Sequence, residues 1–419
     1  MNDDGGQTGF RKQRTVVITG GLGNLGTKLC RHLLSLNDND DATNDDDNHH
    51  GEGSAPTKTN FTYKVILVEH PSFITAAASQ TNTTAANSTT PLLLLQDANV
   101  TLLPCNLGNP TPGQRHRLIK ALTHADVVVH FSAVNPYPNA TWDDCSQSLD
   151  HIYYIFTLAV RCSVRRAIFA SSNHVVGGYK DDHHHQKRHG RRGSLFPHAE
   201  PRVGTMPRNA DDVATSGDGK AYGAAKLAGE RHARTLGNLY GDVTTFVVLR
   251  VGWCQPGENI PATLTAAGSP PEFLLEEKNM DGDDDDDDDY VDDDGMKQGA
   301  TKEDVEQSKK NNNNLNNTTA DDDAANKDEL WYKQMWLSNR DFLAYFTAAM
   351  DVIVPTTAAT ATSIATSEQS GAVHHQQHNN NVQKGFLLLN AMSRNCNARW
   401  NLDDTEKWLG VISIDDSMA

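Results

Sequence analysis

The chain has 419 residues, 37% of them hydrophobic, and a formal net charge of −17. Eleven of the acidic residues fall in one aspartate run between residues 281 and 294, so the rest of the chain is only mildly acidic. The single basic cluster, at 187–192, is too short to suggest nucleic-acid binding. No apolar run approaches the roughly 20 residues of a membrane span, and no signal-like segment opens the chain. We therefore expect a cytoplasmic protein that binds neither nucleic acid nor membrane.

Short apolar runs alternate with helical patterns along roughly the first 250 residues. Residues 15–19 form an apolar run, a glycine turn follows, and residues 25–34 carry apolar side chains at helical spacing. Strands that are apolar throughout and alternate with helices indicate a parallel sheet covered on both faces. The sequence thus predicts an α/β fold with a Rossmann-type doubly wound parallel sheet. Further strands are expected at 64–69, 100–103, 126–131, 167–170 and 243–251, and further helices at 149–160 and 222–236.

Five low-complexity segments interrupt this pattern. They are rich in Asp, Asn, His, Thr and Ser, and their composition predicts disordered loop insertions. We expect a Rossmann domain over 14–255 and a small C-terminal substrate-side part over 256–419. The insertions fall at 37–60, 74–91 and 181–219 in the first part and at 264–328 and 355–383 in the second.

A glycine-rich loop follows the first strand, with Gly20, Gly23 and Gly26 before the helix. This context predicts that the loop, with Asn24 and Leu25, binds a dinucleotide pyrophosphate at the helix N-terminus. A glycine turn without a ligand would have a similar sequence.

Acidic and amide residues follow the next two strands. Glu69 ends the second strand, where a carboxylate would bind the ribose hydroxyls and favour NAD over NADP. Asn106 and Leu107 follow the third strand and are candidates for contact with the adenine. A solvated acid and a turn asparagine would have the same sequence.

Tyr222 and Lys226 lie four residues apart at the start of a predicted helix, so both side chains lie on one face. A free tyrosine titrates near 10, and a nearby ammonium favours its phenolate. Ser172 directly follows the fifth strand, at the sheet edge where ligands of open α/β folds bind. These three residues are the candidate catalytic set.

Glycine loop, strand-end serine and YxxxK, in that order, resemble the extended short-chain dehydrogenase/reductase superfamily, the NAD-dependent epimerase/dehydratase family. Within it, the segment 169–177 looks like the uronate dehydrogenase branch. The resemblance implies hydride transfer from a sugar or sugar-acid hydroxyl to NAD, and in that branch oxidation of a hexuronate C1 hydroxyl to the lactone. Tyr222 would be the acid/base, Ser172 would hold the same oxygen, and Lys226 would lower the tyrosine pKa and bind the nicotinamide ribose. The resemblance to this superfamily also makes a homodimer possible. By the same resemblance, Ser132 would contact the cofactor, and Asn173 and His174 would contact the substrate. Asn135 and Trp253 stand where that branch carries serines, and they are the candidates for substrate contact at those two positions.

The sequence departs from that branch where the substrate carboxylate would bind. The expected arginine is replaced by Trp331 or Tyr332, with Lys333 the nearest cation and Arg340 another candidate. A neutral sugar or other polyol therefore stays open as the substrate. Two other functions also stay open: a nucleotide-sugar epimerase or dehydratase that retains its NAD, and a non-catalytic dinucleotide sensor.

No metal site is expected. The histidine groups at 183–185 and 374–378 lie in low-complexity insertions without carboxylates at ligand spacing. The six cysteines are far apart along the chain, which predicts reduced thiols with neither disulfides nor zinc.

Overall fold

One eight-stranded sheet, with the strand order β3-β2-β1-β4-β5-β6-β8-β7, organises the fold. The computed structural model describes residues 11–38, 60–79, 91–133, 142–179, 193–203, 213–264, 330–356 and 382–418. The chain divides into two compact units, Met1–Asn259 with Gln334–Ala419, and Ile260–Lys333. The sheet belongs to the first unit.

The sheet is wound in both directions from β1. Strand β1 pairs in parallel with β2 on one side and β4 on the other. All further pairs are parallel except that of β8 with the short β7. The α/β doubly wound fold expected from the sequence is confirmed. The strands are β1 Lys12–Thr19, β2 Phe61–Glu69, β3 Val100–Pro104, β4 Val127–His130, β5 Arg166–Ser172, β6 Thr245–Val251, β7 Val382–Gln383 and β8 Phe386–Ala391.

Helices connect the strands. In the first unit they are α1 Asn24–Asp38, α2 Pro71–Ser79, η2 Pro91–Gln96, α3 Pro112–Thr123, α4 Trp142–Arg161, η3 Asn173–Tyr179, α6 Val213–Tyr240, α10 Asn339–Asp351 and α12 Asp403–Leu409. In the second unit the described residues include the single turn η5, Pro261–Thr263.

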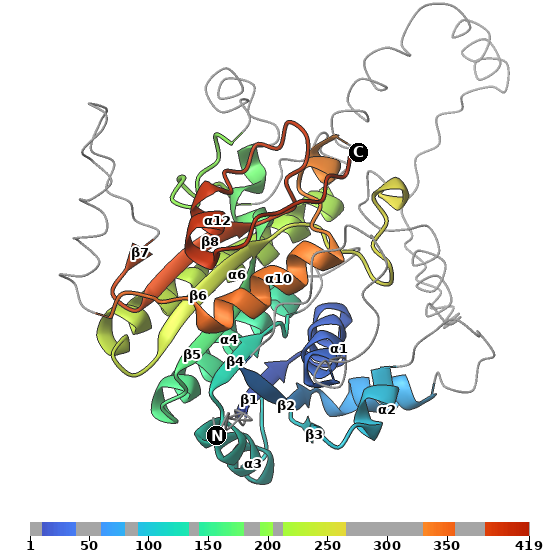
Figure 1. Cartoon of the computed structure of the whole chain (residues 1–419), viewed down its shortest axis with the longest axis vertical. Helices are drawn as coiled ribbons and strands as arrows, with labels where there is room; N and C mark the ends of the chain where they lie inside the picture. Colours follow the sequence, from blue (N-terminus) through green and yellow to red (C-terminus); the bar gives the residue numbers. More distant parts are fainter. Residues whose placement is uncertain are drawn as a thin grey trace, which may run out of the picture. The chain divides into compact units, whose positions relative to one another are not determined.

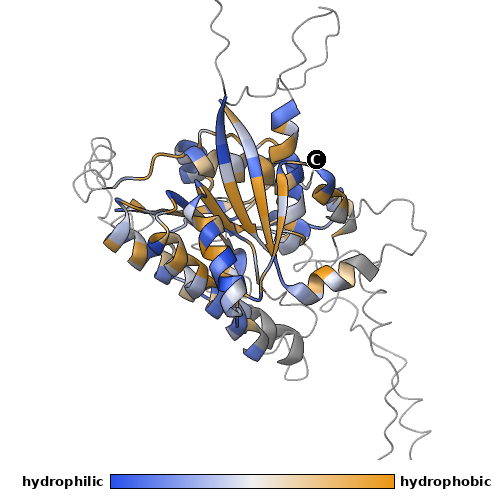
Figure 2. Cartoon of the chain, turned by 90° about the horizontal axis from the view of Figure 1, so that it is seen from below, coloured by the Kyte–Doolittle hydropathy of each residue, from blue (hydrophilic) through white to orange (hydrophobic). Residues whose placement is uncertain are grey.

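Alternating side chains of the strands bury two apolar layers. Val16 and Ile18 of β1 join a cluster that includes side chains of α1 and α10. Val17, between them, joins a second cluster with side chains of α3, α4 and α6. Successive strand residues point to opposite faces, so a strand that is apolar throughout must be covered on both sides. Figure 2 shows strands coloured as hydrophobic over much of their length, whereas the helices also carry hydrophilic residues.

Every strand and helix expected from the sequence is present, but the expected insertions are too wide. Helix α2 continues through Ser79, so residues 74–79 are helical and not part of a loop. Within 181–219, residues 193–203 hydrogen-bond to distant parts of the chain, and α6 already begins at Val213. Most of the other insertion residues, with both histidine groups and the aspartate run, lie outside the described residues.

The end of the chain contributes to the same sheet as the beginning. Strand β8 pairs with β6 over Phe246↔Phe386 to Val251↔Ala391, and Figure 1 shows the red strand β8 beside the yellow strand β6. Substrate binding by residues 256–419 stays a prediction, and the sheet shows that this part also completes the Rossmann core. Among the described helices, none is long and apolar enough to cross a membrane.

Candidate functional site

The glycine loop joins β1 to α1 in a conformation that depends on glycine. Gly20 has φ +65°, a backbone region that residues other than glycine rarely adopt. A Cβ on Gly26 would lie 2.3 Å from the Gly20 carbonyl oxygen, so the start of α1 packs directly on the loop. The Thr27 amide donates to the Gly23 oxygen at 2.9 Å. The first turn of α1 also contains the N–H groups of Asn24, Leu25 and Gly26. N–H groups in the first turn of a helix have no acceptor within the helix.

Other predicted cofactor residues lie around this loop, at the carboxyl edge of the sheet. The Glu69 carboxylate accepts the Leu22 amide at 3.2 Å and the His70 amide at 2.8 Å, and burial raises its pKa. A Cβ on Gly20 would lie 3.0 Å from the Ser132 nitrogen. The structure thus brings Glu69 and Ser132 to the glycine loop from opposite neighbours of β1.

The remaining predicted cofactor residues have structural partners. Asn106 accepts the amides of Gly108 and Asn109 at 3.1 and 3.2 Å, which closes a turn after β3. Leu107 is buried in the second apolar cluster. Asn24 donates to the Cys254 carbonyl at 2.9 Å and ties the loop to the segment after β6. Contacts of Asn24, Leu25, Asn106 and Leu107 with a cofactor stay predictions.

The three candidate catalytic residues meet where β5 ends against α6. The Ser172 side chain lies close enough to Tyr222 to lower the pKa of the phenol. The Lys226 ammonium lies 5.4 Å from the centre of the Tyr222 ring and donates to the Ala170 carbonyl at 2.8 Å. Four-residue spacing on α6 places both side chains toward the end of β5. The structure therefore brings together the set that the sequence suggests.

The electrostatics of this set differ from the simplest expectation. Burial raises the pKa of Tyr222 to about 12, and the hydrogen bond from Ser172 offsets part of this effect. Burial also lowers the pKa of Lys226 to about 7. The sequence leads us to expect that Lys226 lowers the tyrosine pKa. In this structure that pKa is raised, because burial disfavours the charged form of both groups.

Two of the predicted substrate residues lie beside Tyr222. The Asn173 Oδ1 atom lies 3.3 Å from the Ser172 hydroxyl oxygen, and the Asn173 amide nitrogen contacts the Met335 sulfur. The His174 ring meets the Tyr222 ring edge-on, with centroids 5.7 Å apart. Both residues belong to η3, which follows β5 without a break, so their position comes directly from the strand end.

The other two predicted substrate residues are placed differently. Trp253 follows β6 and forms an isolated bridge with Trp336. Its amide donates to the Met335 carbonyl at 2.9 Å. Asn135 lies outside the described residues. A substrate contact stays a prediction for both.

His130, at the end of β4, links the two halves of the site. Its Nδ1 hydrogen-bonds with the Thr19 hydroxyl at 2.7 Å, one residue before the glycine loop. Its ring stacks on Phe169, and the Lys226 ammonium lies 5.0 Å from the centre of the same Phe169 ring. Burial and the neighbouring Lys226 lower the His130 pKa well below its usual value, which favours the neutral imidazole.

Comparison with known proteins agrees with this geometry. The family model described as NAD dependent epimerase/dehydratase family matches residues 16–252, more than half of the chain. The chain belongs to this family. The resemblance drawn from the glycine loop, Ser172 and YxxxK is thereby confirmed.

Curated relatives match over part of their length. An L-arabinose 1-dehydrogenase (NAD(P)(+)) of Haloferax volcanii is 30% identical over 149 residues, 34% of this chain and 50% of the relative. A uronate dehydrogenase of Pseudomonas syringae pv. tomato is 28% identical over 144 residues, 34% of this chain and 40% of the relative. The matches span half or less of these relatives.

Solved structures of uronate dehydrogenases are also similar. A mutant uronate dehydrogenase from Agrobacterium tumefaciens, complexed with NAD, is 13% identical, with a TM-score of 0.46 and coverage of 97% of this chain and 86% of the other. A further mutated uronate dehydrogenase is 14% identical, with a TM-score of 0.47 and coverage of 97% and 83%.

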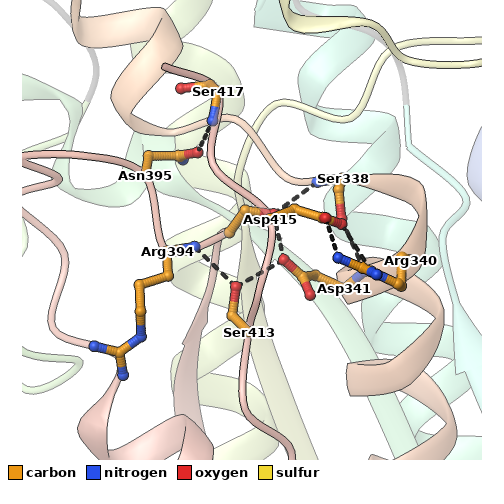
Figure 3. Close-up of polar contacts among 9 residues, drawn as sticks. Ser338, Arg340, Asp341, Arg394, Asn395, Ser413, Asp415 and Ser417 are labelled. Carbon is orange, nitrogen blue, oxygen red and sulfur yellow. Dashed lines mark hydrogen bonds and ion pairs between the residues drawn. The ribbon is translucent and has the colours of Figure 1, made fainter. Parts of the chain in front are cut away.

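Arg340, one candidate for a substrate carboxylate in this family member, is already paired. Its guanidinium forms a two-point ion pair with Asp415, with the Nε bond at 3.1 Å (Figure 3). Beside it, buried Asp341 accepts the hydroxyls of Ser393 at 2.6 Å and Ser413 at 2.7 Å. Arg340 therefore fastens the last residues of the chain to α10. Trp331, Tyr332 and Lys333 belong to the second compact unit, and their substrate role stays a prediction.

Sequence reasoning missed one buried ion pair next to the site. Arg250 of β6 and Glu230 of α6 bind each other through two hydrogen bonds of 2.8 Å. Two signals for it are present: Arg250 interrupts an apolar strand, and Glu230 follows Lys226 by four residues on the same helix face. A charged side chain at a buried position requires a partner of opposite charge, so a buried Arg250 predicts an acidic partner and a buried Glu230 predicts a basic one.

The described residues contain no group of three or more His, Cys, Asp or Glu arranged to hold a metal ion. All six cysteines are described and are free thiols.

Proposed function

We propose that this protein is an NAD-dependent dehydrogenase that oxidises a hydroxyl group of a sugar or sugar acid. The observation that carries the proposal is that Ser172, Tyr222 and Lys226 lie together at the end of β5. The neighbouring strand β4 leads into Ser132, which packs against the glycine loop. The names of the relatives, which act on arabinose, glucose 6-phosphate and uronate, support a sugar as the substrate.

The residues around the glycine loop fit a dinucleotide. Gly20 and Gly26 lie so close to neighbouring backbone that a side chain would not fit at either position. The first-turn amides of α1 would bind a pyrophosphate. Glu69 at the end of β2 would hold the adenosine ribose, and its carboxylate would repel a 2′-phosphate. We therefore propose NAD as the cofactor in preference to NADP. Bound NAD would supply the hydride acceptor.

The chain's own residues would handle the proton. The Ser172 hydroxyl would hold the oxygen of the substrate hydroxyl group. Tyr222, as the phenolate, would take the proton of that substrate group while the carbon that bears it loses a hydride and the C=O bond forms. Lys226, when protonated, is close enough to the Tyr222 ring to stabilise the phenolate that accepts this proton. Asn173 and His174 would face the rest of the sugar.

A hexuronate oxidised at C1 to the lactone is our more specific proposal. It is tested by NADH formation from galacturonate and glucuronate, with galactose and glucose as matched neutral sugars and NADP as the alternative cofactor. Uronates are expected to give the higher kcat/KM. Activity on neutral sugars alone would overturn the uronate proposal but keep the dehydrogenase. NAD that stays bound through purification, with no net NADH formed, would instead support an epimerase or dehydratase.

A Tyr222→Phe variant separates an enzyme from a dinucleotide sensor. Loss of the phenol oxygen should lower kcat by about a hundredfold or more, while binding of NAD changes little. If the variant keeps the full activity or phenotype of the wild type, Tyr222 is not the acid/base.

A further inference from the structure

Arg250 carries a charge into the interior of the sheet. Its side chain is only 2% exposed, and that of its partner Glu230 only 4%. Nε and Nη2 each donate to one oxygen of Glu230 at 2.8 Å, the two-point geometry that guanidinium and carboxylate form best. Apolar residues of similar volume are often at least as stabilising as a buried ion pair, so added stability alone does not account for this pair.

The pair is part of a network that joins four segments. The Ser171 hydroxyl of β5 donates to Glu230 Oε1 at 2.6 Å, and the third guanidinium nitrogen of Arg250 donates to the Pro197 carbonyl at 3.0 Å. Ser171 and Arg250 are also partners in the register of β5 with β6. Two strands, helix α6 and the segment 193–203 therefore meet at one guanidinium.

Each side of this network is next to a proposed catalytic residue. Ser171 immediately precedes Ser172, and Glu230 lies one helical turn beyond Lys226 and two beyond Tyr222. The distance between the Ser172 and Tyr222 hydroxyls depends on how α6 is placed along and around its axis against β5. The bonds from Glu230 to Arg250 and Ser171 restrict both movements.

The segment 193–203, which we call the strap, is hydrogen-bonded to strand β8 and to η3. Asn390 of β8 donates to the Leu195 carbonyl at 3.0 Å, and the Tyr179 hydroxyl donates to the Glu200 carbonyl at 3.0 Å. At its far end, Val203 comes so close to α6 that a Cβ on Gly223 would lie 2.8 Å from the valine Cγ1. Gly223 is adjacent to Tyr222, so the strap packs beside the proposed acid/base.

We propose that Arg250 is a positioning residue for the reaction: through Glu230 and Ser171 it aligns Tyr222 with Ser172, and through Pro197 it holds the strap beside them. The proposal rests on the proposed dehydrogenase function. Arg250 would act through other residues and would not touch the reacting atoms, so its removal should lower kcat far more than it changes KM for NAD.

The test compares Arg250→Met and Arg250→Lys with a matched control, Arg14→Met. Arg14 is also buried and forms a two-point pair, at 3.0 and 2.5 Å, but its partner Asp351 is half exposed, and Arg14 lies near the start of β1, at the end of the sheet opposite to Ser172. Arg250→Met should lower kcat by at least about tenfold, because small misplacements of catalytic groups are costly. Arg250→Lys keeps the charge but not the two-point geometry, so its kcat should lie between those of Arg250→Met and the wild type. Arg14→Met should leave kcat near the wild-type value.

A second measurement does not depend on catalysis. Backbone hydrogen exchange should become faster in the strap and in residues 221–230 of Arg250→Met, but not in those of Arg14→Met. Because Arg250→Met removes a buried partner and could unfold, Ser171→Ala provides a milder variant that deletes one hydrogen bond. Ser171→Ala should lower kcat less than Arg250→Met does, and it should likewise leave KM for NAD almost unchanged.

The outcomes separate the two proposals. If wild-type protein forms no NADH with any sugar, the dehydrogenase proposal fails, and hydrogen exchange still decides whether Arg250 positions α6 and the strap. If wild-type protein is active but Arg250→Met and Arg14→Met lose kcat equally, with equal exchange in the strap, Arg250 is only a stabilising residue and the positioning proposal is overturned.

Discussion

The ammonium of Lys226 donates to the carbonyl of Ala170 at 2.8 Å, in a position where the lysine is only 2% exposed. This bond holds the turn of α6 that carries Tyr222 and Lys226 against β5, and its donor is an amine that is removed from water. Burial lowers the Lys226 pKa to about 7, so the amine is close to half-charged at neutral pH. Both the stability and the activity of the protein should therefore depend on pH.

Replacing Lys226 by Met should raise the stability of the folded protein while abolishing activity. The folded-state pKa of about 7 lies below the usual value of 10.5, so the unfolded chain binds more protons between these two pH values. The free energy of unfolding of the wild type should therefore rise with pH across this window. Lys226→Met should lack that rise, and its stability advantage should be largest below pH 7. Urea unfolding at several pH values measures this, and parallel curves for the two proteins would contradict it.

Oxidation of the substrate should become faster as the pH rises. The Tyr222 pKa is raised to about 12, and the oxidation reaction needs this group to accept a proton. The basic form therefore grows with pH through the alkaline range, and kcat/KM for oxidation should follow it. The reverse reduction, which needs the protonated phenol, should show the opposite trend. A pH profile that Tyr222→Phe retains unchanged would assign the titration to another group.

Glu69→Ala should weaken selection for NAD. The carboxylate accepts two backbone amides of the loop region and lies where the adenosine ribose is expected. Its removal should raise KM for NAD by about tenfold, which corresponds to roughly 1.4 kcal/mol, and should improve the relative use of NADP. Initial rates with both cofactors give the ratio. An unchanged ratio would show that Glu69 serves the loop alone.

Gly26→Ala should damage the cofactor loop, whereas Gly113→Ala should not. A Cβ at Gly26 would lie 2.3 Å from the Gly20 oxygen, so the loop or the helix must move. A Cβ at Gly113, in α3, would meet nothing within 4 Å, and alanine there should be neutral or stabilising by up to about 1 kcal/mol. Thermal unfolding and NAD titration of both variants check the contrast. Equal NAD affinity in the two variants would exclude close packing at Gly26 as a requirement for binding.

Arg340 and Asp341 should differ sharply although they are neighbours. Arg340 is more than half exposed in its pair with Asp415, so Arg340→Gln should cost less than about 1 kcal/mol and leave KM for galacturonate unchanged. Asp341 is buried with two serine hydroxyls on its carboxylate, and Asp341→Ala should cost about 3 kcal/mol. Urea unfolding and uronate kinetics separate the two effects. A large rise in KM for Arg340→Gln would restore its role as a carboxylate ligand.

The features that could be predicted from the sequence are those set by local pattern. Gly20, Ser172 and Glu69 each lie at the end of an apolar strand, and parallel strands bring such ends to one edge. Tyr222 and Lys226 share a helix face by spacing alone. Their positions in the structure follow from these local rules.

The strap could not be predicted in this way. Its bonds reach Asn390, Arg399 and Asn401, about 200 residues later in the chain, and its own composition resembles a solvated loop. Similarly, the short run at 386–391 gives no sign of which strand it joins. The raised Tyr222 pKa depends on burial by tertiary packing, which a four-residue spacing does not report.

The pairing of β8 with β6 also has a consequence for the order of synthesis. Strand β6 ends at Val251 and β8 begins only at Phe386. A nascent chain that has completed β6 therefore carries an open, apolar β-edge while more than a hundred further residues are made. Unpaired edges of this kind are sites of misassociation between chains. Chains that end before residue 386 should therefore aggregate and should not fold as a shortened form of this protein.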